Sequence, residues 1–381
     1  MLNKLKKLDI SILLILCCLM VISAIVIHSA TANNPMYAQT PIKQIIFFVL
    51  GFFVAISAVF FDYRIVLKSW YILYGIGIIM LGLVFFAGAE INGARGWFKI
   101  TESLYFQPAE IVKIILIVGI AYLMGRRQGE KLGFMRDIVP IGLFAFLPFM
   151  LVMLQPDLGN AIIYIVIVLG MLWIGNVKYT HVLIGATAVV AGIFLFVFLF
   201  NAFNQEIYDY LNKENKRHWY ERINTFINPD EATADAKHQS ENAQIAIGSG
   251  GLSGDGYLNG DMKNGGFVPY AYSDSIFVVI GEEFGFQGAA ILLLLYFLLI
   301  YRMIVISYRC YDIRASYMII GIVSMYVFQV FQNIGMMIGL MPITGITLPF
   351  ISYGGTSLIL NMLSIGLVFS INAHQQLYEL E

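Results

Sequence analysis

The chain has 381 residues, of which 59% are hydrophobic and only 12% are charged, and its formal net charge is −1. Soluble globular domains carry about a quarter charged residues, so this composition excludes an ordinary soluble domain. Its three cysteines, Cys17, Cys18 and Cys310, have neither the spacing of a disulfide framework nor that of a metal site. We expect no nucleic acid among its partners.

Several apolar stretches are long enough to cross a bilayer, which takes roughly 17–25 residues. They cover residues 9–30, 42–61, 66–88, 109–124, 137–154, 158–174, 179–200, 276–301, 315–340 and 348–371. Within lipid the backbone must satisfy its own hydrogen bonds, so these stretches are predicted to be helices. We therefore predict an all-α integral membrane protein of about ten transmembrane helices, forming a single polytopic domain over residues 1–381.

An even number of spans places both termini on one side of the membrane. That side holds most of the basic residues, among them Lys4, Arg64, Arg126 and Arg302, so it is predicted to be cytoplasmic. The opposite side holds a large loop, residues 201–275, in which acids balance bases. We expect the functional face to be outside.

The outward segment 91–99 carries two basic residues and a tryptophan. Arg95, with Lys99, could bind a phosphate, and Trp97 could lie at the membrane interface. The alternative is a tight turn with an aromatic belt residue.

The fourth apolar stretch contains an acid and a base on one helical face. Glu110 and Lys113 are three residues apart, and an unpaired ammonium inside an apolar run is costly, so Glu110 is the expected partner of Lys113. A structural ion pair and an anion-binding pair both remain open. Asp157, before the sixth stretch, adds another carboxylate at the membrane edge.

The 201–275 loop has internal order. Phe203, Ile207 and Leu211 recur every four residues, as do Trp219, Ile223 and Ile227, which predicts short interfacial helices. A further short helix is expected over 239–247. The Gly-rich run 248–256 could cradle phosphates, but it lacks the spacing of a P-loop, and a flexible turn is the alternative.

Asp274 lies where this polar loop meets the apolar run that begins at Ile276. Ionisable groups at a membrane edge are costly and therefore functional candidates, although a helix N-cap shared with Ser273 explains the residue equally well. Glu282 and Glu283 interrupt the following span, so at least one of them must face a cavity or a partner.

The segment 342–357 contains two prolines, three glycines and several hydroxyls, which argues against continuous helix. Broken backbone at membrane depth is tolerated only where it is buried in protein or lines a cavity. These features suit an enzyme acting on a lipid-linked anionic substrate, and equally a coupled transporter.

Taken in order, the motifs resemble the shape, elongation, division and sporulation (SEDS) family of peptidoglycan polymerases, most closely its RodA-like members. The matching stretches are Asn92 to Arg95 with Trp97, Gln107 to Glu110 with Lys113, Gln155 to Gly159, Arg222, Gln239-Ser240, Gln244 to Gly251, Val268-Pro269, Ser273 to Phe277, Gly281 to Phe286 and Pro342 to Ser357. Small departures fall at Gly96, at Ala109 and around Tyr270 to Tyr272, where the usual charged Glu is missing.

The resemblance implies ten transmembrane helices and polymerisation of lipid II outside the cytoplasmic membrane, with a class B penicillin-binding protein as the transpeptidase partner. Asp274 then takes the place of the family's essential loop aspartate. The implied substrate-binding residues are Arg95, Trp97, Glu110, Lys113, Asp157, Arg222, Gln239, Ser240 and Glu282. A divalent cation, Mg²⁺ or Mn²⁺, could assist the departing diphosphate, but no ligand set is visible.

On this hypothesis Asp274 is the general base for the acceptor hydroxyl, and cationic groups stabilise the leaving diphosphate. Attack opposite that diphosphate gives a β-1,4 glycan. Two alternatives stay open: a lipid II flippase or other transporter, and a scaffold without activity of its own.

Overall fold

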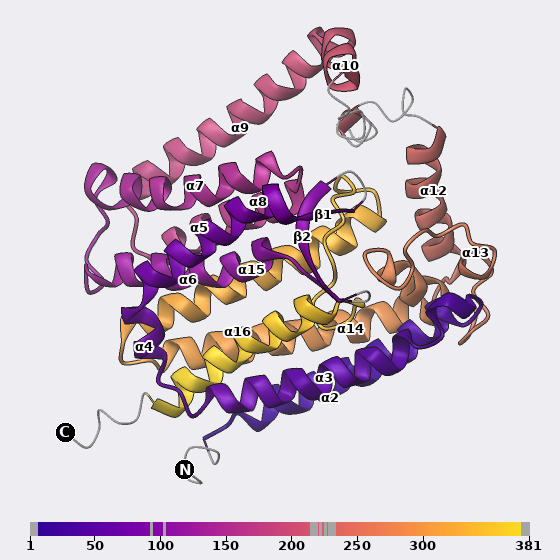
Figure 1. Ribbon diagram of the computed structural model, residues 1–381, viewed down its shortest axis with the longest axis horizontal. Coiled ribbons are helices and arrows are strands. Elements are labelled where there is room, and N and C mark those ends of the chain that lie inside the picture. The colour runs from indigo at the N-terminus through magenta and orange to yellow at the C-terminus, as the bar shows by residue number, and fades with distance from the viewer. Residues whose placement is uncertain are drawn as a thin grey trace.

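The computed structural model describes residues 7–91, 94–101, 104–213, 220, 223–224, 227 and 234–374, and Figure 1 shows a bundle of long helices. These are α2 (Ile10–Thr31), α3 (Thr40–Ala58), α5 (Trp70–Ala87), α6 (Pro108–Gly125), α7 (Val139–Leu154), α8 (Leu158–Ile174), α9 (Tyr179–Ala202), α14 (Ile276–Tyr308), α15 (Ile313–Met337) and α16 (Gly355–His374). Among the described residues, 9 helical segments are long and apolar enough to cross a membrane, and the shorter apolar α8 fits the remaining predicted span. The prediction of a helical, multi-pass membrane protein is confirmed.

Shorter helices connect the long ones. They are η1 (Pro35–Tyr37), α4 (Tyr63–Lys68), the π-helical η2 (Phe134–Ile138), α10 (Asn204–Lys213), α12 (Ala234–Ser249) and α13 (Asp261–Asn264). In the large loop, α10 carries Ile207 and Leu211, and α12 includes the helix predicted over 239–247. The predicted helix from Trp219 to Ile227 lies largely outside the described residues.

Three helices, α6, α15 and α16, form the centre of the bundle and are its most buried spans. Helix α16 packs on α3, and α15 packs on both α8 and α14. Helix α9 lies at the outer edge in Figure 1, and most of its described side chains are exposed. The amide nitrogen of Asn372 donates to the carbonyl of Lys7 at 2.8 Å, so the first and last helices meet at one end of the bundle.

The connection between α5 and α6 is a small antiparallel sheet, in the order β1 (Ala89–Ile91), β2 (Ala94–Thr101) and β3 (Leu104–Phe106). A tight turn was one expectation for this segment, and its strands were not predicted. Phe98 pairs with Phe106 and Lys99 with Tyr105, so the backbone groups of this segment bond to one another. The sheet turns Trp97 and Tyr105 into the interior of one end of the bundle.

The last span starts later than predicted, at Gly355 and not at residue 348. The preceding segment, 339–354, is not helical, and its Phe350 has a positive φ of 64°. Side chains satisfy its backbone: Asn333 donates to the carbonyl of Ile346 at 2.7 Å, and Ser352 Oγ accepts from the N–H of Leu348 at 2.8 Å. A broken segment at this depth needs such internal partners, because lipid supplies none.

Helix α14 is interrupted at Gly285, where φ is 59° and ψ is −157°. The helical bonds from Phe286 and Gln287 to the carbonyls four residues earlier are replaced by bonds to the glycine-rich run. The N–H groups of Phe286 and Gln287 donate to the carbonyls of Gly251 and Leu252 at 2.9 and 3.1 Å. The freed carbonyls of Glu282 and Glu283 accept from Asp255 and Gly256 at 3.0 and 3.1 Å. The run 250–256 thus completes the broken helix and is not a free turn.

This exchange requires close backbone contact at Gly250. A Cβ added to Gly250 would lie 2.1 Å from the carbonyl oxygen of Gly281, whereas one added to Gly248 would meet nothing within 4 Å. We expect Gly250→Ala to lower the free energy of unfolding by about 1–3 kcal/mol, as overpacking typically does. Thermal unfolding of the purified protein in detergent measures the effect. Gly248→Ala is the matched control, and equal Tm values for the two variants would contradict the assignment.

Candidate functional site

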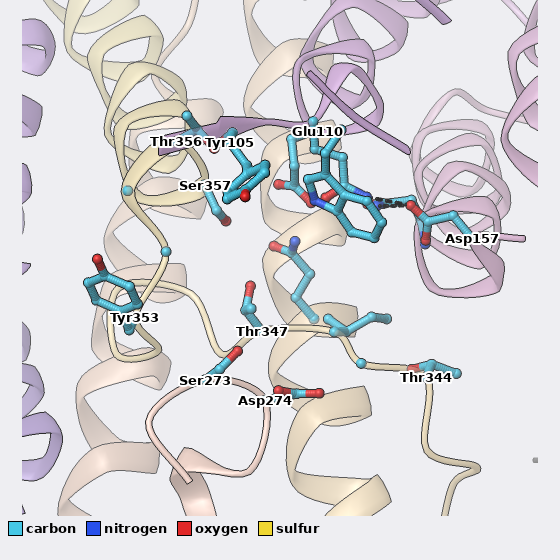
Figure 2. Close-up of a pocket in the computed structure, with 18 of the residues that line it drawn as sticks. Tyr105, Glu110, Asp157, Ser273, Asp274, Thr344, Thr347, Tyr353, Thr356 and Ser357 are labelled. Atoms are coloured by element: carbon cyan, nitrogen blue, oxygen red, sulfur yellow. Dashed lines mark hydrogen bonds between the residues drawn. The ribbon is translucent and has the colours of Figure 1, made fainter. Parts of the chain in front are cut away.

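A cavity of about 410 Å³ opens among the small sheet, α6, α8, α15 and the broken segment before α16. Its volume lies within the roughly 300–1,000 Å³ typical of ligand pockets. Figure 2 shows Asp274 and Ser273 on one side of it and Glu110 and Asp157 on the opposite side. Its polar lining is Trp97, Tyr105, Gln107, Glu110, Asp157, Asn160, Tyr270, Ser273, Asp274, Gln329, Thr344, Thr347, Tyr353, Thr356 and Ser357. Residues far apart in the sequence therefore share one chamber.

Asp274 is held at this cavity through its backbone. The amide nitrogen of Asn333 donates to the carbonyl of Asp274 at 2.8 Å, while Ser352 Oγ donates to the neighbouring carbonyl of Ser273 at 2.6 Å. The N-cap of α14 is Ser275, so the N-cap explanation of Asp274 does not hold. A Cβ built on Gly345 would lie 3.6 Å from the Asp274 carboxylate, which shows that this carboxylate faces the broken segment.

The opposite wall contains a buried ion pair. Lys113, only 1% exposed, donates from Nζ to Glu110 Oε1 at 2.7 Å. Glu110 neutralises the ammonium of Lys113, which would otherwise be an isolated charge inside the bundle, and this pairing is the one that the three-residue spacing predicted. Glu110 lines the cavity, while Lys113 lies behind it, outside the lining.

Asp157 caps α8 beside this pair. Its carboxylate accepts from the backbone and side chain of Asn160 at 3.0 and 2.8 Å, and from Gln107 Nε2 at 2.6 Å. The pKa of the Asp157 carboxyl is raised, chiefly because the group is buried. The hydrogen bonds from Asn160 lower this pKa, but they do not cancel the effect of burial, and the nearby negative charge of Glu110 raises it further. Asp157 therefore takes up a proton more readily than an exposed aspartate.

Several residues expected at the site lie elsewhere. Ser240, on α12, accepts from Gln244 at 3.4 Å and does not line the cavity, nor does the nearby Gln239. Arg95 belongs to β2, but its side chain is outside the described part of the chain, and Arg222 is outside it altogether.

Glu282 is fully buried away from the cavity lining. Its carboxylate accepts from the backbone N–H groups of Met262 and Lys263 at 2.6 and 3.2 Å, in the first turn of α13. The neighbouring Glu283 accepts from Ser29 at 2.6 Å and pairs with the Nζ of Lys263. At least one of these acids was expected to face a cavity or a partner. In the structure both Glu282 and Glu283 bond to other parts of the protein, and their bonds to Met262 and Lys263 attach the loop to α14.

Other lining residues were not predicted from the sequence, notably Tyr105, Asn160 and Gln329. An amide inside an apolar span was a usable signal for Gln329. The sequence contains no such signal for Tyr105, because the position of this residue depends on the pairing of β2 with β3. Among the described residues, no group of three or more His, Cys, Asp and Glu side chains could hold a metal ion.

Comparison with known proteins agrees with this architecture. The family model FTSW_RODA_SPOVE, described as "Cell cycle protein", matches residues 4–377. The chain is 33% identical over 379 residues to the peptidoglycan glycosyltransferase MrdB of Escherichia coli K12, covering 97% of this chain and 95% of that one. It is 30% identical to stage V sporulation protein E of Bacillus subtilis, covering 97% and 98% of the two chains.

Solved structures give the same result. A chain of a peptidoglycan synthase complex that coordinates polymerization and crosslinking matches with a TM-score of 0.77 and 27% identity, over 96% of this chain and 98% of that one. The rod shape determining protein RodA of Thermus thermophilus matches with a TM-score of 0.69 and 26% identity, over 96% and 97%. The resemblance inferred from the motifs is confirmed: the chain belongs to the FtsW/RodA/SpoVE family of cell cycle proteins.

Proposed function

We propose that this membrane protein is a peptidoglycan glycosyltransferase that polymerises lipid II into β-1,4 glycan strands at the outer face of the cytoplasmic membrane. The observation that carries the proposal is the cavity in which Asp274 faces Glu110 and Asp157 across a chamber built from parts of the fold that are far apart in the sequence. The name of the relative MrdB, which matches over 97% of this chain, supports the reaction class. Both termini then lie in the cytoplasm.

In this reaction the anomeric carbon already carries a good leaving group, a lipid-linked diphosphate. The protein must mainly hold the acceptor hydroxyl against that carbon, which proximity favours by many orders of magnitude. Asp274 takes the proton of the acceptor hydroxyl as the new glycosidic bond forms and the bond to the diphosphate breaks. The hydrogen bonds from Asn333 to the carbonyl of Asp274 and from Ser352 to that of Ser273 support this role, since a general base must keep a fixed position.

The diphosphate needs positive charge or hydrogen-bond donors as it departs. We propose Arg95 for this role, with Trp97 and Tyr105 forming the adjacent wall. Lys113 acts through Glu110: because its Nζ is bonded to Glu110, it neutralises a carboxylate that would otherwise repel the diphosphate. Arg222, Gln239 and Ser240 remain candidates for contacts with parts of the substrate beyond the cavity.

A partner that crosslinks the glycan follows from the same chemistry, because uncrosslinked strands make no wall. We propose a class B penicillin-binding protein transpeptidase. The match to a chain of a peptidoglycan synthase complex supports a partner of this kind.

Asp274→Asn tests the base directly. We expect the rate of lipid II polymerisation by purified protein to fall about 10²–10⁴-fold, the usual contribution of a general base, with Tm unchanged. Asp261→Asn removes an equivalent charge at an exposed side chain, that of the first residue of α13, and serves as the control. A folded Asp274→Asn protein that polymerises at the rate of the control would remove Asp274 from the mechanism.

The raised pKa of Asp157 gives a pH prediction. When the pH falls through that raised pKa, Asp157 becomes neutral earlier than an ordinary aspartate would, and its repulsion of the anionic diphosphate disappears. We expect the KM for lipid II to fall as the pH is lowered across this range. In Asp157→Asn, which retains an oxygen to cap α8, KM should be low and independent of pH. The same KM–pH curve in both proteins would rule out this role of Asp157.

A further inference from the structure

One face of α15 presents three buried amides, Gln329, Gln332 and Asn333, at a spacing that places them side by side along the helix. Two of them, Gln332 and Asn333, make hydrogen bonds that hold the protein's own backbone and side chains. Gln332 donates to the carbonyl of Pro342 at 3.0 Å and to Thr344 Oγ1 at 3.1 Å. Asn333 donates to the carbonyls of Asp274 and Ile346. These bonds hold the broken segment and the loop of Asp274 together.

Gln329 differs from both. Its side chain is 2% exposed, and its Oε1 is buried with no hydrogen-bond partner among the described residues. Gln332 and Asn333 also have an amide oxygen without such a partner, but only Gln329 of the three lines the cavity. A buried acceptor without a partner costs free energy, and of these three oxygens only that of Gln329 belongs to a residue beside a space that a ligand can fill.

The missing partner must be a hydrogen-bond donor, because a carbonyl oxygen can only accept. Diphosphate oxygens are acceptors and cannot supply it. Sugars can, through their hydroxyl and acetamido N–H groups. Apart from Asp274, the cavity wall near the broken segment offers hydroxyl groups, among them those of Thr344 and Thr347, whereas the opposite wall holds Glu110 and Asp157.

We propose that Gln329 is a substrate-binding residue that accepts a hydrogen bond from a sugar hydroxyl or acetamido N–H. The wall of Gln329, Thr344 and Thr347 is thereby the sugar subsite next to Asp274. This inference rests on the proposed function, and it adds a specificity determinant that reads the saccharide and not the diphosphate.

The test compares two ligands in an inactive background. In Asp274→Asn protein, which binds without turnover, Gln329→Leu should weaken lipid II binding by about 10- to 100-fold, the usual effect of a lost buried hydrogen bond. Binding of undecaprenyl diphosphate, which has no sugar, should be unchanged. With Asp274 intact, Gln329→Leu should lower kcat/KM for lipid II by a similar factor.

Thermal unfolding separates binding from folding. Gln329→Leu removes an unsatisfied acceptor, so the ligand-free Tm should be unchanged or higher. Gln332→Leu, one turn along the same face, is the matched control and should lower Tm, since it breaks two bonds to the broken segment. A fall in Tm of Gln329→Leu comparable to that of the control would show that Gln329 is structural and would overturn the inference.

Three further outcomes separate a failure of this inference from a failure of the proposed function. If the unmodified protein polymerises lipid II and Gln329→Leu does so with the same kcat/KM, the sugar subsite is wrong and the proposed function stands. Weakened binding of both ligands alike would also overturn the subsite, because the effect would then not be specific to the sugar. If the unmodified protein neither binds nor polymerises lipid II, the proposed function fails and the inference fails with it.

Discussion

A single amide group, that of Asn333, determines how the cavity is built. Its nitrogen bonds to the carbonyl of Asp274 at 2.8 Å and to that of Ile346 at 2.7 Å, so one side chain on a buried helix holds two irregular segments. Neither segment has a regular secondary structure that could satisfy these carbonyls. In a membrane protein an unsatisfied carbonyl costs several kcal/mol, which makes this bridge a condition for the fold as well as for the site.

Charge is distributed unevenly around the chamber. Glu110 has its counter-ion Lys113 behind it, and Asp157 is surrounded by amide donors from Gln107 and Asn160. One wall therefore carries carboxylates whose charge is neutralised or reduced from behind. The facing wall offers Asp274 among hydroxyl and amide groups. An anionic lipid carrying a neutral saccharide has the complementary distribution, a charged part and an uncharged polar part.

Much of the architecture was predictable because it depends on local rules. The ten apolar stretches correspond to helices, and the ion pair of Glu110 and Lys113 follows from a three-residue spacing on one face. The prolines and glycines near Pro342 correctly indicated broken backbone, although the start of the last helix was placed too early. The strands around Trp97 were not predicted, since their pairing depends on which segments meet and not on a periodic pattern.

The role of the glycine-rich run could not be predicted from the sequence either, because its carbonyls and N–H groups bond to residues 27 to 35 positions later. Phe286 and Gln287 obtain their acceptors from this run, and Glu282 and Glu283 obtain their donors from it. During biosynthesis the loop is made before α14. A helix whose middle is completed by that loop can reach its final form only after the loop has docked on it. Maturation of this span is therefore coupled to docking of the segment preceding it, and a chain stalled before that step would leave unbonded peptide groups in the middle of α14.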